Sequence, residues 1–564
     1  MDRRSHLSRT LLARAARTFV AVVGFLGPLL PSAHAARRAD PRVASVPRPP
    51  VPAPSPALAS TAFTLKWEWN GDIESPGFAR TCATPVVVQL TDDDGNGTID
   101  SRDMPDVVFS HGDGSRTITA LDGATGRSVL EIASPLVSSA EIAAGDLDGD
   151  GLVEIVALDA PRRRMLAFRP AGTFREVPFA GSTSPDSLDA IAIADIQQDG
   201  TPDVYVAGRA GIALDLVHDV PGLEILRNDI TPQGLKSVTD LDGDGEADIV
   251  VYTGETLSVR DHLGAPVGAT FLLPGATPSA PPVIADLDAD GAPEIFLTTG
   301  LEALALEWSA GVFTVKWRIA AIDVSGYGGA TAFDLDGDGA AEILYRDEDA
   351  FLVLDGRTGA VVFRDDTPSA TGTERPIVAD IDGDGGPEIV VGGCQGPARP
   401  FAPNLVRAWD VASSVPTRAI WNQATYHACN VDDDGSIPRL QGLPWREHGT
   451  WMSQRGPGDC APGPEPPPLA PPCADCAGLL ATVASAEIDV EGVRTSFTAK
   501  ANAACAATER WQLHAARGEL CALLQEVAAQ AGQHVTPDSA TAIAACVSAF
   551  AVAHGLPADP CARR

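Results

Sequence analysis

The segment DLDGDGEADIVVY, from Asp240 to Tyr252, places five acidic residues within nine positions and follows them directly with an apolar run. Carboxylates this close repel one another, so the pattern predicts a bound cation that offsets the repulsion. The acids at positions 1, 3, 5 and 9 can converge because Gly245, at position 6, permits a sharp turn. This oxygen-only ligand set suits calcium better than magnesium, because magnesium demands stricter octahedral geometry and sheds water reluctantly.

The acidic segment is one copy of a repeat. The first acidic residues of successive copies lie 45 to 54 residues apart, at Asp92, Asp146, Asp195, Asp240, Asp286, Asp334 and Asp380. In each unit one apolar strand precedes the acidic loop and a second follows it, and turns such as LDGATG at Leu121 and LDGRTG at Leu354 indicate a hairpin. Four antiparallel strands in about 45 residues are typical of a propeller blade, so we predict an all-β, seven-bladed β-propeller.

Two other architectures are alternatives. The segment NVDDDGSIP, from Asn430 to Pro438, copies the first three ligand positions and would be the remnant of an eighth blade. A parallel β-helix is the second alternative, although its rungs are usually shorter than these units. If FTLKWEWNG near the N-terminus pairs with strands within residues 405–440, one blade is built from both chain ends and the ring has no exposed edge.

Five copies carry an acid at all four ligand positions, whereas an Asp-Gly turn without metal would explain only a single copy. The predicted calcium ligands of these copies are Asp146, Asp148, Asp150 and Glu154; Asp240, Asp242, Asp244 and Asp248; Asp286, Asp288, Asp290 and Glu294; Asp334, Asp336, Asp338 and Glu342; and Asp380, Asp382, Asp384 and Glu388.

Two copies depart from this pattern. The third copy has the neutral Gln197 at position 3, so its remaining ligands Asp195, Asp199 and Asp203 are predicted to bind weakly or not at all. The first copy is longer and matches positions 1, 3, 5, 9 and 12 of an EF-hand-like loop with Asp92, Asp94, Asn96, Asp100 and Asp103.

On these repeated D-x-D-x-D-G-x-x-[DE] loops and the short apolar strands after them, residues 63–439 resemble the FG-GAP/VCBS repeat family, which includes the head of integrin α subunits. The resemblance implies a propeller with calcium in its loops. It also implies a secreted or cell-surface location and a role in adhesion or binding. Within the family, the repeats specify the fold much better than the function.

The ends of the chain indicate export. Residues 1–35 combine arginines, a short apolar segment and the small residues before Ala35, which predicts a cleaved signal peptide. Proline-rich linkers at 36–60 and 456–472 would flank a propeller at 61–455, and residues 473–564 are predicted to form a small helical module containing disulfides. Outside the cytoplasm the ten cysteines can pair. We expect Cys429 to pair with Cys394 or Cys82, and we assign no pairs to the six cysteines of the module.

The net charge of the chain and its motifs argue against some classes of function. The chain has 41 basic and 75 acidic residues, a net charge of −34, which argues against binding nucleic acid. No segment after the signal peptide approaches the ~20 apolar residues that span a bilayer. We found no convincing catalytic set and expect a non-enzymatic scaffold for an unknown protein or carbohydrate ligand. The alternative is a carbohydrate-active enzyme of polysaccharide-lyase type or a quinone-dependent dehydrogenase. Either a ligand groove or ring closure would explain the distinctive residues Trp421, Asn422, Tyr426 and His427.

Overall fold

The computed structural model describes residues 61–70, 81–111, 116–134, 136, 141–158, 164–169, 172–178, 190–195, 201–207, 212–215, 235–262, 264–276, 280–323, 328–370, 372–394, 406–447, 449–458, 460–462, 473, 476–510, 512–554, 556 and 560–561. The predicted signal peptide and the proline-rich segment after it lie outside these residues, as does most of the second linker.

The described strands form seven sheets, six of them four-stranded and one three-stranded. Sheets 1 and 2 consist of β2 (Val86–Val88), β3 (Asp106–His111), β4 (Arg116–Asp122) and β5 (Ser128–Ser134), and of β6 (Ala143–Gly145), β7 (Glu154–Leu158), β8 (Arg164–Arg169) and β9 (Gly172–Pro178). Sheets 3 and 4 consist of β10 (Ala190–Ala194), β11 (Asp203–Ala207) and β12 (Ile212–Asp215), and of β13 (Leu235–Thr239), β14 (Asp248–Thr253), β15 (Thr256–Arg260) and β16 (Pro266–Leu272).

Sheets 5 and 6 consist of β17 (Val283–Ala285), β18 (Glu294–Thr298), β19 (Glu302–Ser309) and β20 (Val312–Ala320), and of β21 (Ala330–Phe333), β22 (Glu342–Arg346), β23 (Phe351–Leu354) and β24 (Val361–Asp365). Sheet 7 contains β25 (Ile377–Ala379), β26 (Glu388–Gly392), β27 (Val406–Val411) and, from the other end of the chain, β1 (Phe63–Trp69). Strand β1 pairs antiparallel with β27, within the range 405–440 that the sequence predicted as its partner.

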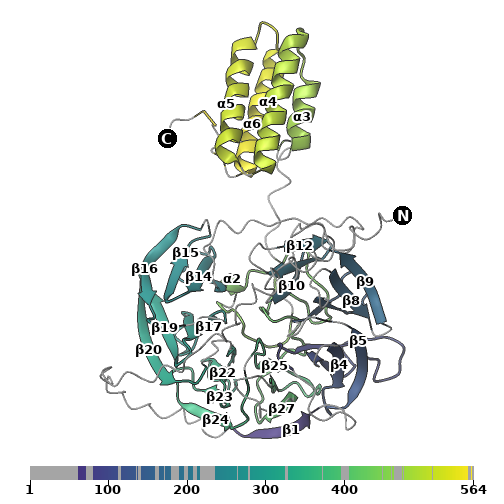
Figure 1. Cartoon of the computed structure of the whole chain (residues 1–564), viewed down its shortest axis with the longest axis vertical. Helices are drawn as coiled ribbons and strands as arrows, with labels where there is room; N and C mark the ends of the chain where they lie inside the picture. Colours follow the sequence, from purple (N-terminus) through teal and green to yellow (C-terminus); the bar gives the residue numbers. More distant parts are fainter. Residues whose placement is uncertain are drawn as a thin grey trace, which may run out of the picture. The chain divides into compact units, whose positions relative to one another are not determined.

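The sheets are arranged around a common centre, which is a propeller-like arrangement (Figure 1). Their strands are short apolar runs between Asp- and Gly-rich turns, and the first two strands of most sheets are buried along their whole length. The core lies between neighbouring sheets. One apolar cluster joins residues of sheets 1 and 2 to residues of sheet 7, including Val87, Ile155 and Val390.

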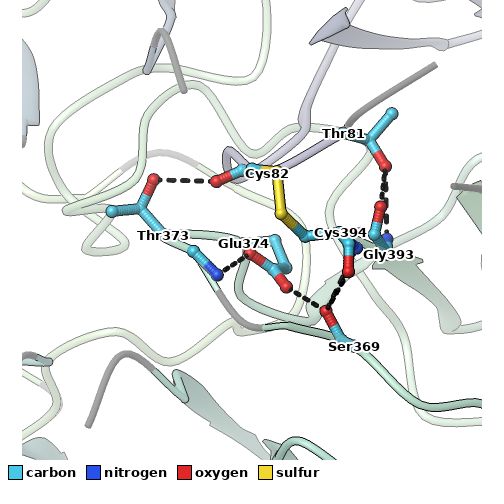
Figure 2. The surroundings of a disulfide bond; sticks show 8 residues. Thr81, Cys82, Ser369, Thr373, Glu374, Gly393 and Cys394 are labelled. Carbon is cyan, nitrogen blue, oxygen red and sulfur yellow. Dashed lines mark hydrogen bonds between the residues drawn. A yellow bond between two sulfur atoms is a disulfide. The ribbon is translucent and has the colours of Figure 1, made fainter. Parts of the chain in front are cut away.

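Sheets 1 and 7 are also joined by the disulfide between Cys82 and Cys394, which are 312 residues apart in sequence. Figure 2 shows hydrogen bonds around it: the Thr373 hydroxyl donates to the Cys82 carbonyl at 3.2 Å, and the Thr81 hydroxyl donates to the Gly393 carbonyl at 2.7 Å. The Thr373 amide also donates to the Cys82 carbonyl, at 2.9 Å. The Ser369 hydroxyl donates to the Glu374 carboxylate at 2.6 Å on the segment between sheets 6 and 7. We call this joint the seam.

Within the described residues 412–447 and 449–458, the chain after β27 forms no further sheet. Instead it bonds to the first strands of several sheets, and we call residues 417–455 the central segment. Its Trp421 exchanges two backbone hydrogen bonds with Val87 of β2, and its Trp451 exchanges two with Ile284 of β17. The NVDDDGSIP stretch, which we considered a remnant eighth blade, forms a turn in which the Asp432 amide donates to the Ser436 carbonyl at 2.9 Å.

The predicted pairing of Cys429 with Cys394 or Cys82 is wrong. Cys429 pairs with Cys460, 31 residues later, because the central segment folds back so that Gly442 lies against both cysteines. A Cβ atom at Gly442 would lie 2.6 Å from Cys460 Cβ and 3.2 Å from Cys429 Cβ, and only glycine leaves room for this contact.

Residues after the second linker form the predicted helical part. Besides the short α2 (Pro444–Glu447) of the central segment, the helices are α3 (Cys476–Ser485), α4 (Glu491–Glu509), α5 (Leu513–Gln530) and α6 (Pro537–Ala553). They share an apolar core, and the disulfides there are Cys473–Cys546, Cys476–Cys505 and Cys521–Cys561. Among the described residues, no helix is both long and apolar enough to cross a membrane.

Candidate metal centres

Each acidic loop connects the first and second strands of its sheet, and the loop at Asp240 shows the common geometry. Asp240 accepts the Gly243 amide on Oδ1 at 2.7 Å and the Gly245 amide on Oδ2 at 2.8 Å. Asp244 accepts the Glu246 amide at 2.7 Å. Gly245 adopts a φ of 87°, which favours glycine, and this explains why position 6 carries it.

The other four complete loops repeat this pattern. In each, the first aspartate accepts the amides of positions 4 and 6, as Asp146, Asp286, Asp334 and Asp380 do. The fifth-position aspartate accepts the amide of position 7, as Asp150, Asp290, Asp338 and Asp384 do. The same local hydrogen bonds therefore shape all five loops.

The acid at position 9 begins the second strand and is buried in every complete loop. One of its oxygens accepts the amide of position 2, between 2.8 and 3.0 Å, in Glu154, Asp248, Glu294, Glu342 and Glu388. This bond fixes the carboxylate so that its other oxygen faces the loop.

The loop carboxylates converge as calcium ligands should. In five loops, three acids each offer an oxygen within 4.8 Å of the others: Asp92, Asp94 and Asp103; Asp146, Asp148 and Glu154; Asp240, Asp242 and Asp248; Asp286, Asp288 and Asp290; and Asp334, Asp336 and Glu342. The donors are oxygens alone, which fits calcium. The clustered acids of each loop would hold the ion, and it would neutralise their mutual repulsion. Among these five clusters, the fifth-position acid belongs only to that of the loop at Asp286.

The two loops that depart from the sequence pattern, the first and the third, differ in how far the structure describes their predicted ligands. In the first loop Asp103 joins the cluster and accepts the Asp93 amide at 2.9 Å, whereas Asp100 pairs with Arg102 and lies outside the cluster. The side-chain oxygen of Asn96 accepts the Thr98 amide at 2.8 Å. In the third loop Asp195 and Asp203 are buried, but Asp199 lies outside the described residues, so its weaker binding stays a prediction.

In the described part of the chain, basic side chains that the sequence analysis did not single out also contact the complete loops. Arg169 bonds to Asp148 at 2.7 Å and to Glu154 at 2.5 Å, and Arg357 contacts Asp338. Lys316 bonds to Glu294 at 2.8 Å, and Lys66 bonds to Glu388 at 3.3 Å. A signal for the lysines was present in the sequence, because both stand in the same motif, FTLKW and FTVKW.

Of the residues considered for a ligand groove, Trp421, Asn422 and Tyr426 are buried and His427 is half-buried. Trp421 and Tyr426 stack with ring centroids 4.3 Å apart, and the Asn422 side chain donates to the Ala144 carbonyl at 3.1 Å. Burial lowers the pKa of His427 to about 4, so its imidazole is neutral at physiological pH. Trp421, Asn422 and Tyr426 pack the central segment against the sheets.

The buried position-9 acids predict an unusual pH dependence. Burial and neighbouring carboxylates raise the pKa of Glu342 to about 9, that of Glu388 to about 7 and that of Asp248 to about 6. An acid whose pKa is raised on folding binds more protons in the folded state, so its contribution is present below its unfolded pKa and lost as pH rises. In chelator, the melting temperature should therefore rise as pH falls from 8 to 6.

In saturating calcium the trend should reverse, because protons then compete with the ion for the same oxygens. Calorimetric melts at pH 6, 7 and 8 in both conditions would check this. Parallel trends with and without calcium would contradict it.

The family model for FG-GAP-like repeats matches residues 146–206, 240–297 and 334–391, three stretches that contain complete acidic loops. This chain carries FG-GAP-like repeats. Among solved structures, the V. cholerae biofilm matrix protein Bap1 is similar with a TM-score of 0.55 and 18% identity, over 70% of this chain and 99% of that one. At that identity the similarity supports the propeller-like fold alone.

Two lyases are less similar. The exotype rhamnogalacturonan lyase YesX has a TM-score of 0.35 and 16% identity over 72% of this chain and 83% of that one. The Bacillus licheniformis rhamnogalacturonan lyase PL11 has a TM-score of 0.34 and 15% identity over 75% and 82%. No curated protein sequence matches this chain.

Proposed function

We propose that this protein is an exported, calcium-stabilised, seven-bladed β-propeller that binds protein or glycan ligands without catalysing a reaction. The observation that carries the proposal is the repetition of one loop geometry: five complete loops use their carboxylates in the same hydrogen-bond pattern. The chain has 75 acidic residues. Those of the complete loops shape the turns and would hold structural ions, which gives them a role other than catalysis.

The ring interpretation is supported by the mixed seventh sheet and the seam. Strand β1 completes the sheet of β25 to β27, and the Cys82–Cys394 disulfide joins that sheet to sheet 1. The export interpretation is supported by the cysteines, because all ten are paired and disulfides persist in oxidising compartments. The central segment covers edges of the first strands, which leaves the loops and outer strands as binding surfaces.

A binding array tests this function. The mature chain would be applied to glycan and protein arrays in millimolar calcium and again in chelator. The affinity of each ligand that the arrays identify would then be measured by titration. Because the similar solved structure is a biofilm matrix protein, matrix polysaccharides are the first glycans to include. Binding in calcium that is lost in chelator is the expected result. Shortening of any polysaccharide by the purified chain would favour the carbohydrate-active enzyme instead.

A further inference from the structure

Two of the four lysines in the chain occupy equivalent places in different sheets. Lys66 lies in β1 and Lys316 in β20, and each of these strands is at the edge of its sheet. Each lysine is also the extra residue at a register shift, between Leu65 and Trp67 in one strand and between Val315 and Trp317 in the other. A β-bulge of this kind changes the direction of a side chain, which in a regular strand would be set by the alternation between the two faces of the sheet.

The tryptophan after each lysine fixes the strand against the next sheet. The Trp67 indole donates to the Gly123 carbonyl at 2.7 Å, and the Trp317 indole donates to the Gly356 carbonyl at 2.6 Å. Both acceptors belong to the LDGATG and LDGRTG turns of the neighbouring sheet. In those turns Gly126 and Gly359 give each indole its space, because an added Cβ would lie 2.7 and 2.5 Å from the ring. The lysine position is therefore set by packing.

Both ammonium groups reach the same two positions of an acidic loop. Lys316 contacts Asp288 and Glu294, and these are positions 3 and 9 of the loop at Asp286. Lys66 contacts Asp382 and Glu388, the same positions of the loop at Asp380. Only about 15% of each lysine side chain is exposed.

The four predicted ligand acids of the loop at Asp240 have no such partner among the described residues. Within the part of the chain that the structure describes, no lysine or arginine contacts Asp240, Asp242, Asp244 or Asp248. The charges that act on Asp248 are those of its own loop, and they raise its pKa together with burial. By contrast, the hydrogen bond from Lys316 opposes the rise that burial causes in the pKa of Glu294.

We propose that Lys66 and Lys316 are built-in counter-ions: they hold the loops at Asp380 and Asp286 together without calcium and weaken calcium binding there relative to the loop at Asp240. The inference rests on the proposed calcium role. An ammonium bonded to two ligand oxygens competes with the ion for them, and its charge repels the ion across a few ångströms. The propeller thus has a calcium-dependent loop at Asp240 and loops that stay ordered without calcium at Asp286 and Asp380.

The test compares Lys316→Met with the wild-type full chain. Calcium is titrated into chelator-treated, dialysed protein by calorimetry, and melting temperatures are measured in chelator and in saturating calcium. Lys316→Met should bind calcium at one site at least about tenfold more tightly, or 1.4 kcal/mol. It should melt below wild type in chelator and close to wild type in calcium, because the ion then replaces the lost ammonium.

Three further variants complete the test: two are controls and one repeats it at a second loop. Lys316→Arg retains the charge and should titrate like wild type. Lys500→Met removes the lysine that bonds to Glu526 at 2.7 Å in the helical part, and should leave every calcium site unchanged. Lys66→Met applies the same test to the loop at Asp380, and decides the question if Lys316→Met does not fold.

The outcomes separate the two proposals. A wild-type chain that takes up no calcium refutes the calcium role itself. A wild-type chain that binds calcium, together with lysine variants that bind it no more tightly or that lose equal stability in both conditions, refutes the counter-ion inference alone.

Discussion

Removal of calcium by a chelator is expected to lower the melting temperature of the sheet region strongly. Extracellular calcium modules often bind at ~10⁻⁴ to 10⁻³ M, so at about 1 mM free calcium each occupied site contributes about 0.4 to 1.4 kcal/mol through mass action. Five complete loops together would then contribute roughly 2 to 7 kcal/mol, which is a large part of the stability of a typical domain. The bare loops would also retain the repulsion among their converging carboxylates.

Differential scanning calorimetry of the full chain in calcium, magnesium and chelator measures this effect. The helical part provides an internal reference, because its three disulfides and apolar core involve none of the acidic loops. Its transition should stay in place while that of the sheets moves down in chelator. Magnesium should restore little, since its stricter geometry fits these loops less well. An unchanged sheet transition in chelator would show that the loops need no ion.

A matched pair of substitutions at Asp244 separates metal binding from turn formation. Asp244 accepts the Glu246 amide, so Asp244→Ala removes a turn hydrogen bond together with the predicted ligand oxygen. Asp244→Asn keeps an acceptor for that amide and removes only the charge. We expect Asp244→Asn to lose stability in calcium but not in chelator, and Asp244→Ala to lose some in both. Equal losses for Asp244→Asn in both conditions would mean that this loop binds no ion.

The acidic loops could be predicted from the sequence because their geometry is local. The hydrogen bonds that the Asp240, Asp244 and Asp248 carboxylates accept join residues fewer than nine positions apart, from the amide of Leu241 on Asp248 to that of Gly245 on Asp240. The spacing of the acids and the positions of the glycines were therefore nearly enough to predict the geometry of the loop. The repeat of this local unit also predicted the strands on either side.

The central segment could not be predicted, because its partners are distant and it follows no strand pattern. Buried Arg418 is held by the carbonyls of Ala428 and Val431, at 2.7 and 2.8 Å, and by an ion pair with Asp433. Such a network depends on the path of the chain. The error over Cys429 has the same origin, since only that path brings Cys460 to it.

Loss of the seam disulfide is the other large effect that we expect. The pair Cys82→Ala and Cys394→Ala should reduce the free energy of unfolding in calcium by on the order of 5 kcal/mol, because the bond closes a very long loop in the unfolded chain. The surrounding hydrogen bonds are retained in this variant. The Thr373 amide bonds to the backbone carbonyl of residue 82, and the Thr81 hydroxyl bonds to that of Gly393. The loss therefore reports on loop closure rather than on lost polar contacts.

The matched control is the pair Cys429→Ala and Cys460→Ala, whose cysteines are 31 residues apart instead of 312. Since loop-closure entropy grows with the logarithm of loop length, the seam pair should cost about 2 kcal/mol more than this control. Urea unfolding of both variants in saturating calcium provides the comparison. If the seam variant loses no more stability than the control, the loop-closure explanation of the seam disulfide is wrong.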